Sequence, residues 1–433
     1  MNLAKTLFGA TILAGGLAAA PAFAQSGTGA TPAANCEFKV GAVLSLTGSI
    51  AAIGTAIADV GQLAVDHMNA AGGVNGCRVR YVLRDDQGQP NVGLDAAKAL
   101  VEIDRVPAIA GAISTGVSLP ILTSVTVPGR VTQVSCCSSA PNFTDMAKKG
   151  DTKGYFFRTV PTNEPLAVVY AKNAIERGWK KISVIYVNND YGASLGRSFK
   201  GAIEKFGGTV TKMVPYNPEQ PSYRAEVTQA MDGNPDAMFL ISFPADGATA
   251  TREWISLGGT QNLILANALR VDPYVSAVGA KFLEKSYGLD NAQVRGPSVD
   301  AFNAAYREKF GKDPNGPGLH TQYDAVATIL LAAEAAGAGK ADGTGIRDNI
   351  RKVTGGDGVE VTPGVAGFKA AKEALAAGKS IRYVGATGPL KFDENGDVSG
   401  PLLVWGVKDG KLTTLDTWTN ERVNAAMAEY QKK

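Results

Sequence analysis

Apolar runs of strand length alternate with amphipathic segments of helix length along most of the chain. The first round of this alternation predicts strands at 37–45 and 78–84 and helices at 51–69 and 92–102. A second round of similar length covers 165–268. Such alternation favours parallel sheets with helices on both faces. The pattern therefore predicts an α/β protein with two lobes of like architecture and a ligand cleft between them.

Small hydroxylated residues follow two consecutive buried strand patterns in the first round. Ser114, Thr115 and Ser118 follow one strand, and the serines of 135–139 follow the next. Hydroxyls and free N–H groups at the carboxyl ends of neighbouring parallel strands can bind a small anion such as a carboxylate. The alternative is that these residues only cap helices. Because no catalytic base lies in this stretch, it predicts a binding site.

The first 24 residues have the pattern of a cleaved secretory signal. Lys5 precedes an apolar run at 7–20, and a small-residue triplet ends at Ala24. This run is too short for a membrane-spanning helix. Residues 25–35, rich in Gly, Ser, Thr and Ala, predict a flexible tether. We therefore expect an exported protein.

Four cysteines in an exported chain suggest oxidation. Cys36 and Cys77 each precede a strand pattern, and neighbouring parallel strands would bring them close enough for a disulfide. Cys136 and Cys137 are adjacent and lie inside the predicted binding stretch. They can form a vicinal disulfide with a flat apolar face or remain two buried thiols, and the sequence leaves both possibilities open.

Charge and histidine content narrow the classes of partner. A net charge of +3 with scattered Lys and Arg favours neither nucleic acid nor an anionic membrane surface. His67, on an amphipathic helix pattern, and His320 are too few for a His-rich metal site. Asp393, Asn395 and Asp397 alternate as in a calcium loop, but the other residues of that loop are out of place, so a hairpin turn is predicted. We expect no metal and no other cofactor.

Eight segments carry a family resemblance. They follow one another over nearly the whole chain after residue 35: VGAVLSLTGSIAAIG, NAAGGVNG, RDDQGQP, GAISTGVSLP, SSAPNFT, FFRTVP, NNDYGASLG and GPLKFDENGDVSG. Together they resemble the periplasmic binding proteins of ABC importers for hydrophobic amino acids, of which the leucine/isoleucine/valine-binding protein is the best-known member.

The resemblance implies a type I periplasmic binding protein, with two Rossmann-like lobes joined by three crossover strands. Lobe 1 would consist of 36–158 and 291–400, and lobe 2 of 159–290 and 401–433. Such a protein is a periplasmic monomer that closes over one small ligand and delivers it to a membrane permease and its ATPase. It has no catalytic residues.

The resemblance also assigns ligand-binding residues in lobe 1, position by position. Ser114 and Thr115 match the hydroxyl cluster that receives the ligand carboxylate in the family. Cys137 matches a residue that contributes its backbone, and Ser139 matches a second hydroxyl. Ile53 matches a residue of the side pocket.

Lobe 2 would supply the closing face of the site. Tyr191 matches the aromatic residue that closes over the ligand in the family; the alternative is an aromatic residue packed on its own lobe. Two positions depart from the pattern of the amino acid binders. Phe243 stands where they have a tyrosine, and Ala268 stands where they have the glutamate that pairs with the ligand ammonium.

Ala268 leaves the ligand class open, because burying an ammonium without a carboxylate costs roughly several kcal/mol. Asp246 or Asp272 could supply the charge from a shifted position, whereas Arg270 would favour an additional acid group. The predicted ligand is a small carboxylate, either an apolar or branched-chain amino acid or an aromatic or aliphatic acid or amide. A ligand sensor for a membrane receptor is the alternative role. An enzyme is disfavoured, because the site segments contain no nucleophile elbow and no close carboxylate pair.

Overall fold

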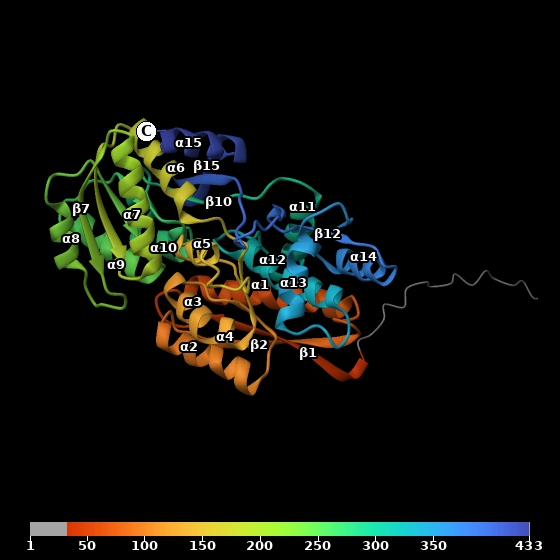
Figure 1. Ribbon diagram of the computed structural model, residues 1–433. Coiled ribbons are helices and arrows are strands. Elements are labelled where there is room, and N and C mark those ends of the chain that lie inside the picture. The colour runs from red at the N-terminus through yellow and green to blue at the C-terminus, as the bar shows by residue number, and fades with distance from the viewer. Residues whose placement is uncertain (1–32, 433) are drawn as a thin grey trace, which may run out of the picture.

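The computed structural model describes residues 33–432 and shows two α/β lobes side by side (Figure 1). The predicted signal peptide, 1–24, lies outside the described residues, as does 25–32 of the predicted tether. Residues 33–35 belong to the first strand, β1, rather than to a tether.

Five parallel strands form the sheet of lobe 1, in the order β2, β1, β3, β4, β5. β3 and β4 are buried along their whole length, as expected for strands covered by helices on both faces. The strands span Ala33–Leu44 (β1), Cys77–Asp85 (β2), Ala108–Gly111 (β3), Thr132–Ser135 (β4) and Phe156–Arg158 (β5).

Helices connect these strands close to the predicted positions. α1 (Ala51–Ala70) matches the helix predicted at 51–69. The helix predicted at 92–102 begins earlier, because Pro90 suits the first turn of α2 (Pro90–Lys98), which continues as a π-helical turn. The other helical segments are η1 (Ala99–Ile103), α3 (Thr115–Ile121), η2 (Leu122–Thr126), α4 (Val127–Gly129) and α5 (Asn142–Lys148).

Seven strands form the sheet of lobe 2, in the order β15, β14, β10, β9, β8, β6, β7. β14 runs antiparallel to both of its neighbours, and the other pairs are parallel. The strands span Lys181–Val187 (β6), Thr209–Tyr216 (β7), Ala237–Ile241 (β8), Leu263–Leu265 (β9), Tyr287–Asn291 (β10), Leu402–Lys408 (β14) and Lys411–Trp418 (β15).

The helices of lobe 2 pack around this sheet, and the C-terminal helix α15 lies beside α6 (Figure 1). An ion pair of 2.6 Å between Lys172 and Glu429 joins those two helices. The helical segments are α6 (Asn163–Glu176), α7 (Asp190–Lys205), α8 (Arg224–Met231), α9 (Pro244–Ser256), η3 (Asn267–Leu269), α10 (Asp272–Val278), η4 (Ala280–Phe282) and α15 (Asn420–Lys432).

A third group of elements packs against lobe 1. Its helix α12 (Leu319–Ala336) is buried on nearly all sides, because its small and aliphatic residues contact α1 on one side and α13 and α14 on others. His67, predicted on a helix surface, is half-buried, and its Nδ1 lies 2.6 Å from the Tyr323 hydroxyl. The other elements are α11 (Pro297–Phe310), α13 (Gly343–Thr354), α14 (Val365–Ala376), β11 (Val359–Val361), β12 (Ile381–Gly385) and β13 (Gly388–Pro389).

The chain crosses between the lobes three times, at 159–162, 292–296 and 390–401, which agrees with the predicted type I architecture. Two crossovers touch, since the Ala292 N–H donates to the Pro401 carbonyl at 2.9 Å. The third contains the turn predicted as a hairpin. That prediction is wrong in one respect, because no paired strands flank the turn. Instead, Asp393 accepts the N–H groups of Asn395 and Asp397, and the Asp397 side chain binds the buried Arg158.

Candidate functional site

A cavity lies between the two lobes, with a volume of about 500 Å³ including the solvent at its mouth. Its wall comes from the carboxyl ends of strands in both sheets and from the start of α12, as is usual for ligand sites in α/β folds. The lining residues are Ile50, Ile53, Ile113, Ser114, Cys136, Cys137, Val160, Tyr191, Phe243, Asn267, Ala268, Asp290, Asn291, Pro317, Gly318 and Thr321.

Ser114 places a hydroxyl group at the lobe 1 side of the cavity. It is the N-cap residue of α3, and its side chain makes no capping hydrogen bond. The first N–H groups of a helix have no partner inside the helix, so they point outward as donors beside this hydroxyl. The arrangement suits a small anion.

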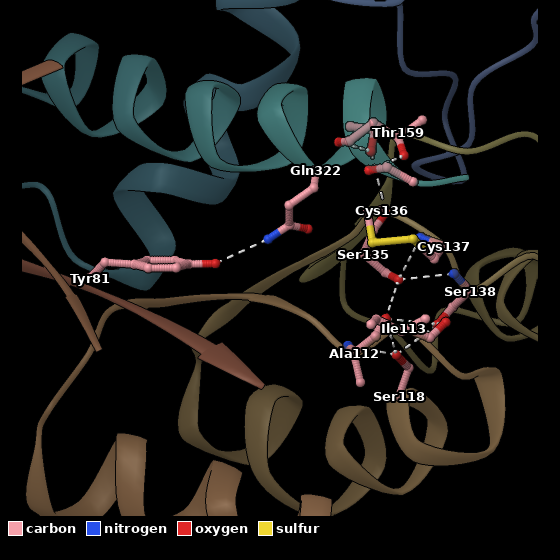
Figure 2. Close-up of a disulfide and its surroundings, with 12 residues drawn as sticks. Tyr81, Ala112, Ile113, Ser118, Ser135, Cys136, Cys137, Ser138, Thr159 and Gln322 are labelled. Carbon is pink, nitrogen blue, oxygen red and sulfur yellow. Dashed lines mark hydrogen bonds between the residues drawn. A yellow bond between two sulfur atoms is a disulfide. The ribbon is translucent and has the colours of Figure 1, made fainter. Parts of the chain in front are cut away.

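Three other serines have a structural role (Figure 2). The Ser135 hydroxyl donates to the Ala112 carbonyl at 2.8 Å, and the Ser138 hydroxyl bonds to that of Ser118 at 2.7 Å. The Ser118 hydroxyl also accepts the Ala112 N–H at 2.8 Å. These bonds join the turns that follow β3 and β4, so they hold the cavity wall in place. The hydroxyl-rich stretch thus contains both scaffold residues and a cavity residue.

Thr115 and Ser139, two of the predicted ligand residues, do not line the cavity. Thr115 is buried, and its hydroxyl has no hydrogen-bond partner among the described residues. The Ser139 carbonyl accepts the N–H of Asn163, at the start of α6. Both residues therefore lie outside the cavity lining, and Ser139 lies next to the end of the first crossover.

Both disulfides are present in the structure. Cys36 and Cys77 are joined, with their Cα atoms 4.9 Å apart, which confirms the predicted pair. Cys136 and Cys137 form the vicinal disulfide, so of the two open possibilities the structure has the bonded one. This disulfide lines the cavity directly after β4.

Lobe 2 closes the cavity with two aromatic side chains. The rings of Tyr191 and Phe243 are stacked, with centroids 5.9 Å apart and an angle of 17° between their planes. The Tyr191 hydroxyl donates to Asn267 Oδ1 at 2.7 Å. Burial raises the pKa of Tyr191, so this hydroxyl keeps its proton and remains a donor. The pair presents an apolar face to the cavity beside Ala268.

Asp290 is a cavity residue that the sequence reasoning missed. It lies at the end of β10, is buried, and accepts from Arg270 at 2.8 Å. Burial raises its pKa, and the Arg270 guanidinium opposes that rise. Its position at the carboxyl end of a parallel strand is the signal that could have found it. The two acidic candidates considered instead, Asp246 and Asp272, do not line the cavity.

His320, in the first turn of α12, gives the stability of the folded protein a pH dependence. Burial, and to a lesser extent Arg270, lowers its pKa from 6.5 to about 3. The folded protein therefore favours the neutral form of His320. The contribution of His320 to the stability of the fold is complete above pH 6.5 and is lost as the pH falls toward 3. Between pH 7 and pH 5 this loss amounts to about 2 kcal/mol.

We predict that His320→Gln has a lower free energy of unfolding than the wild type at pH 7. The difference between the two proteins should be about 2 kcal/mol smaller at pH 5. The glutamine amide can still donate to Asn303 Oδ1, the present partner of His320 Nε2. Urea unfolding at both pH values measures the gap. A gap of equal size at the two pH values would show that His320 does not titrate between folded and unfolded states.

The described residues contain no group of three or more His, Cys, Asp or Glu side chains placed to hold a metal ion. Among the same residues, no helix is both long and apolar enough to cross a membrane.

Comparisons with known proteins place this geometry in a family. Residues 37–411 match the sequence profile of the family described as periplasmic binding protein. Leu/Ile/Val-binding protein homolog 3 of Brucella melitensis is 26% identical over 390 residues, which cover 90% of this chain and 96% of that protein.

Solved structures share the fold. The leucine-binding protein LivK of Thermotoga maritima superposes with a TM-score of 0.75 at 23% identity, over 89% of this chain and 99% of that chain. A solute-binding protein of an ABC transporter from Rhodopseudomonas palustris, solved in complex with 3,4-dihydroxybenzoic acid, superposes with a TM-score of 0.69 at 21% identity. The match covers 89% of this chain and 98% of that chain. Because the family profile extends across both lobes and the cavity between them, this chain belongs to the periplasmic binding protein family and has its type I fold.

Proposed function

We propose that this protein is the solute-binding component of an ABC importer and captures a small carboxylate-bearing ligand between its lobes. One observation carries the proposal: the cavity takes its wall from both lobes, with Ser114 and Ile53 on one side and Tyr191 and Phe243 on the other. A ligand in this cavity would contact both lobes only when they are closed. Ligand binding would therefore stabilise the closed form over the open one.

The units that move would be lobe 1, residues 36–158 and 291–400, and lobe 2, residues 159–290 and 401–433. The division of the strands between two large sheets supports these boundaries. The three crossovers would act as the hinge, since they are the covalent connections between the sheets.

The ligand carboxylate would bind at Ser114, where the hydroxyl and the first N–H groups of α3 converge, with the backbone of Cys137 beside it. Thr115 and Ser139 remain candidate donors, since each is next in sequence to, or two residues from, a lining residue. The hydroxyl of Thr115 has no partner among the described residues, which makes it available.

The rest of the ligand would be apolar, because the disulfide and Ile53 from lobe 1 and Phe243 and Ala268 from lobe 2 give the cavity apolar walls on both sides. Both an aliphatic side chain and an aromatic ring suit such a wall. The names of the similar proteins include leucine and 3,4-dihydroxybenzoic acid as ligands. An apolar amino acid is therefore the first candidate and an aromatic or aliphatic acid or amide the second.

The proposed setting follows from the family and the predicted signal peptide. The protein would be exported to the periplasm, act as a monomer without a cofactor, and deliver its ligand to a membrane permease and ATPase. A sensor that presents the same ligand to a membrane receptor is the alternative. We propose no catalytic activity.

A thermal-shift screen of amino acids and of aromatic and aliphatic acids tests the proposal. At least one acid should raise the unfolding temperature of the wild type and bind with one site per chain by calorimetry. Ser114→Ala should bind it about tenfold more weakly, because one charge-assisted hydrogen bond of ~1.4 kcal/mol is lost. The control Ser380→Ala removes an exposed hydroxyl outside the cavity and should bind as the wild type does. Absence of any response to small carboxylates would refute the proposal.

A further inference from the structure

The vicinal disulfide is a part of the cavity wall that reduction can alter. Cys136 and Cys137 both line the cavity, yet they differ in access. Cys136 is completely buried, whereas Cys137 is half-buried and is the sulfur that a small molecule could reach. A reagent that enters the open cleft would therefore meet Cys137 first.

The backbone around the disulfide is held firmly (Figure 2). The Ser135 hydroxyl accepts the N–H of Ser138 at 3.0 Å and lies 3.3 Å from the N–H of Cys137. The same hydroxyl donates to the Ala112 carbonyl. The loop that carries both sulfurs is thus tied to the turn that leads into Ser114, so a change at the sulfurs acts close to the proposed carboxylate position.

Gly318, which also lines the cavity, packs closely against the disulfide. A Cβ atom at this position would lie 2.9 Å from the Cys137 sulfur and 2.5 Å from Ile57, which shows how closely the backbone approaches. With φ at +80°, Gly318 also holds a conformation that side chains disfavour. The sulfur of Cys137 has little room to retreat from the cavity.

Cleavage of the S–S bond must move a sulfur. Bonded sulfurs are about 2 Å apart, whereas non-bonded heavy atoms need roughly 3.5 Å or more. Cys136 is enclosed by core residues and the Gly318 backbone lies against Cys137 on one side, so the direction that remains open to the Cys137 sulfur is the cavity. Reduction would therefore narrow the cavity and replace its flat apolar face by two thiols.

We propose that the Cys136–Cys137 disulfide is a thiol-sensitive switch that lowers ligand affinity when it is reduced. This inference rests on the proposed function of the cavity. A thiolate of a dithiol reductant attacks the Cys137 sulfur and forms a mixed disulfide, and Cys136 leaves as a thiolate that takes up a proton. The second thiol of the reductant then releases Cys137 as a thiol, so that the protein gains two thiols and the reductant becomes a cyclic disulfide.

Ligand binding and reduction of the disulfide are thermodynamically linked. If reduction weakens ligand binding by a given factor, bound ligand must make the disulfide harder to reduce by the same factor. A ligand in the closed cavity also covers Cys137. A filled binding protein would thus keep its disulfide, and an empty one would lose it more readily.

The variant Cys36→Ser/Cys77→Ser isolates the vicinal disulfide for the test. L-leucine and 3,4-dihydroxybenzoate serve as probes in calorimetric titrations with and without dithiothreitol, and maleimide labelling with mass spectrometry establishes the state of Cys136 and Cys137. We expect the probe that binds the oxidised protein to bind about tenfold more weakly after reduction, a change of ~1.4 kcal/mol. Equal affinity in protein whose two thiols are both labelled would overturn the switch.

Two further arms separate this inference from the function on which it rests. The matched variant Cys136→Ser/Cys137→Ser, which keeps Cys36–Cys77, should show no effect of dithiothreitol on affinity. If neither probe binds the oxidised protein, the proposed function fails for both compounds. Amide hydrogen exchange on ligand-free protein then decides about the switch: faster exchange at 112–114 and 135–139 after reduction supports it, and unchanged exchange overturns it.

Discussion

Ala268→Trp is expected to abolish ligand binding while leaving the protein folded. Ala268 lies in η3 of lobe 2, lines the cavity, and is 7% exposed. An indole at this position would occupy the space between the disulfide and the aromatic pair. The ligand and the ring cannot share that space, so affinity should fall about 100-fold or more, or ~2.7 kcal/mol.

Calorimetric titration with the acid that gives the largest thermal shift measures this loss. The unfolding temperature of Ala268→Trp should stay within about 4 °C of the wild type, because the proposed hinge lets the lobes separate around the ring. Ala425→Trp, on the exposed face of α15 in the same lobe, is the matched control and should bind normally. Unchanged affinity in Ala268→Trp would mean that the ligand binds elsewhere.

Arg158→Leu is expected to cause the largest loss of stability. Arg158 is fully buried, and its Nε donates to Asp397 at 2.6 Å. Its Nη atoms donate to the carbonyls of Ser138 and Ala140 and to the Thr144 hydroxyl. Removal of the guanidinium would leave a buried carboxylate without its cation. Such a loss costs about 3–5 kcal/mol, or on the order of 10 °C in unfolding temperature.

Two comparisons identify the cause of that loss. Arg158→Leu/Asp397→Leu should be more stable than Arg158→Leu alone, because the unpaired charge is gone. Arg382→Leu removes an exposed ion pair with Glu360 and should change stability by less than about 0.5 kcal/mol. If the double variant were no more stable than the single one, the buried charge would not be the source of the effect.

The sequence predicted the architecture well because its signals are local. Strand and helix patterns repeat in order, and Cys36 and Cys77 could be paired because each precedes a strand pattern in the sequence. Predictions failed where a contact with residues distant in the sequence determines the local structure. The turn at Asp393 has the composition of a hairpin, but its residues belong to a crossover that binds Arg158.

The site could be predicted only in part for the same physical reason. Ser114 and Ser118 belong to the same hydroxyl cluster in the sequence, yet Ser114 lines the cavity and Ser118 bonds to Ser138 in the next turn, a contact that the sequence does not reveal. Asp290 could not be predicted from its neighbours in the sequence, because it is far along the chain from Ala268 and only the sheet brings the two residues to one cavity. Asp290 lies in β10, the strand that precedes the second crossover, and pairing of β10 with β9 brings it to the cavity.

A crystal structure of the protein with its tightest-binding acid tests the central claim most directly. The account predicts one ligand between the lobes, with its carboxylate within hydrogen-bonding distance of the Ser114 hydroxyl and its apolar part between the Cys136–Cys137 disulfide and Phe243. A ligand bound outside this cavity, or one inside it with its carboxylate turned away from Ser114, would contradict the account.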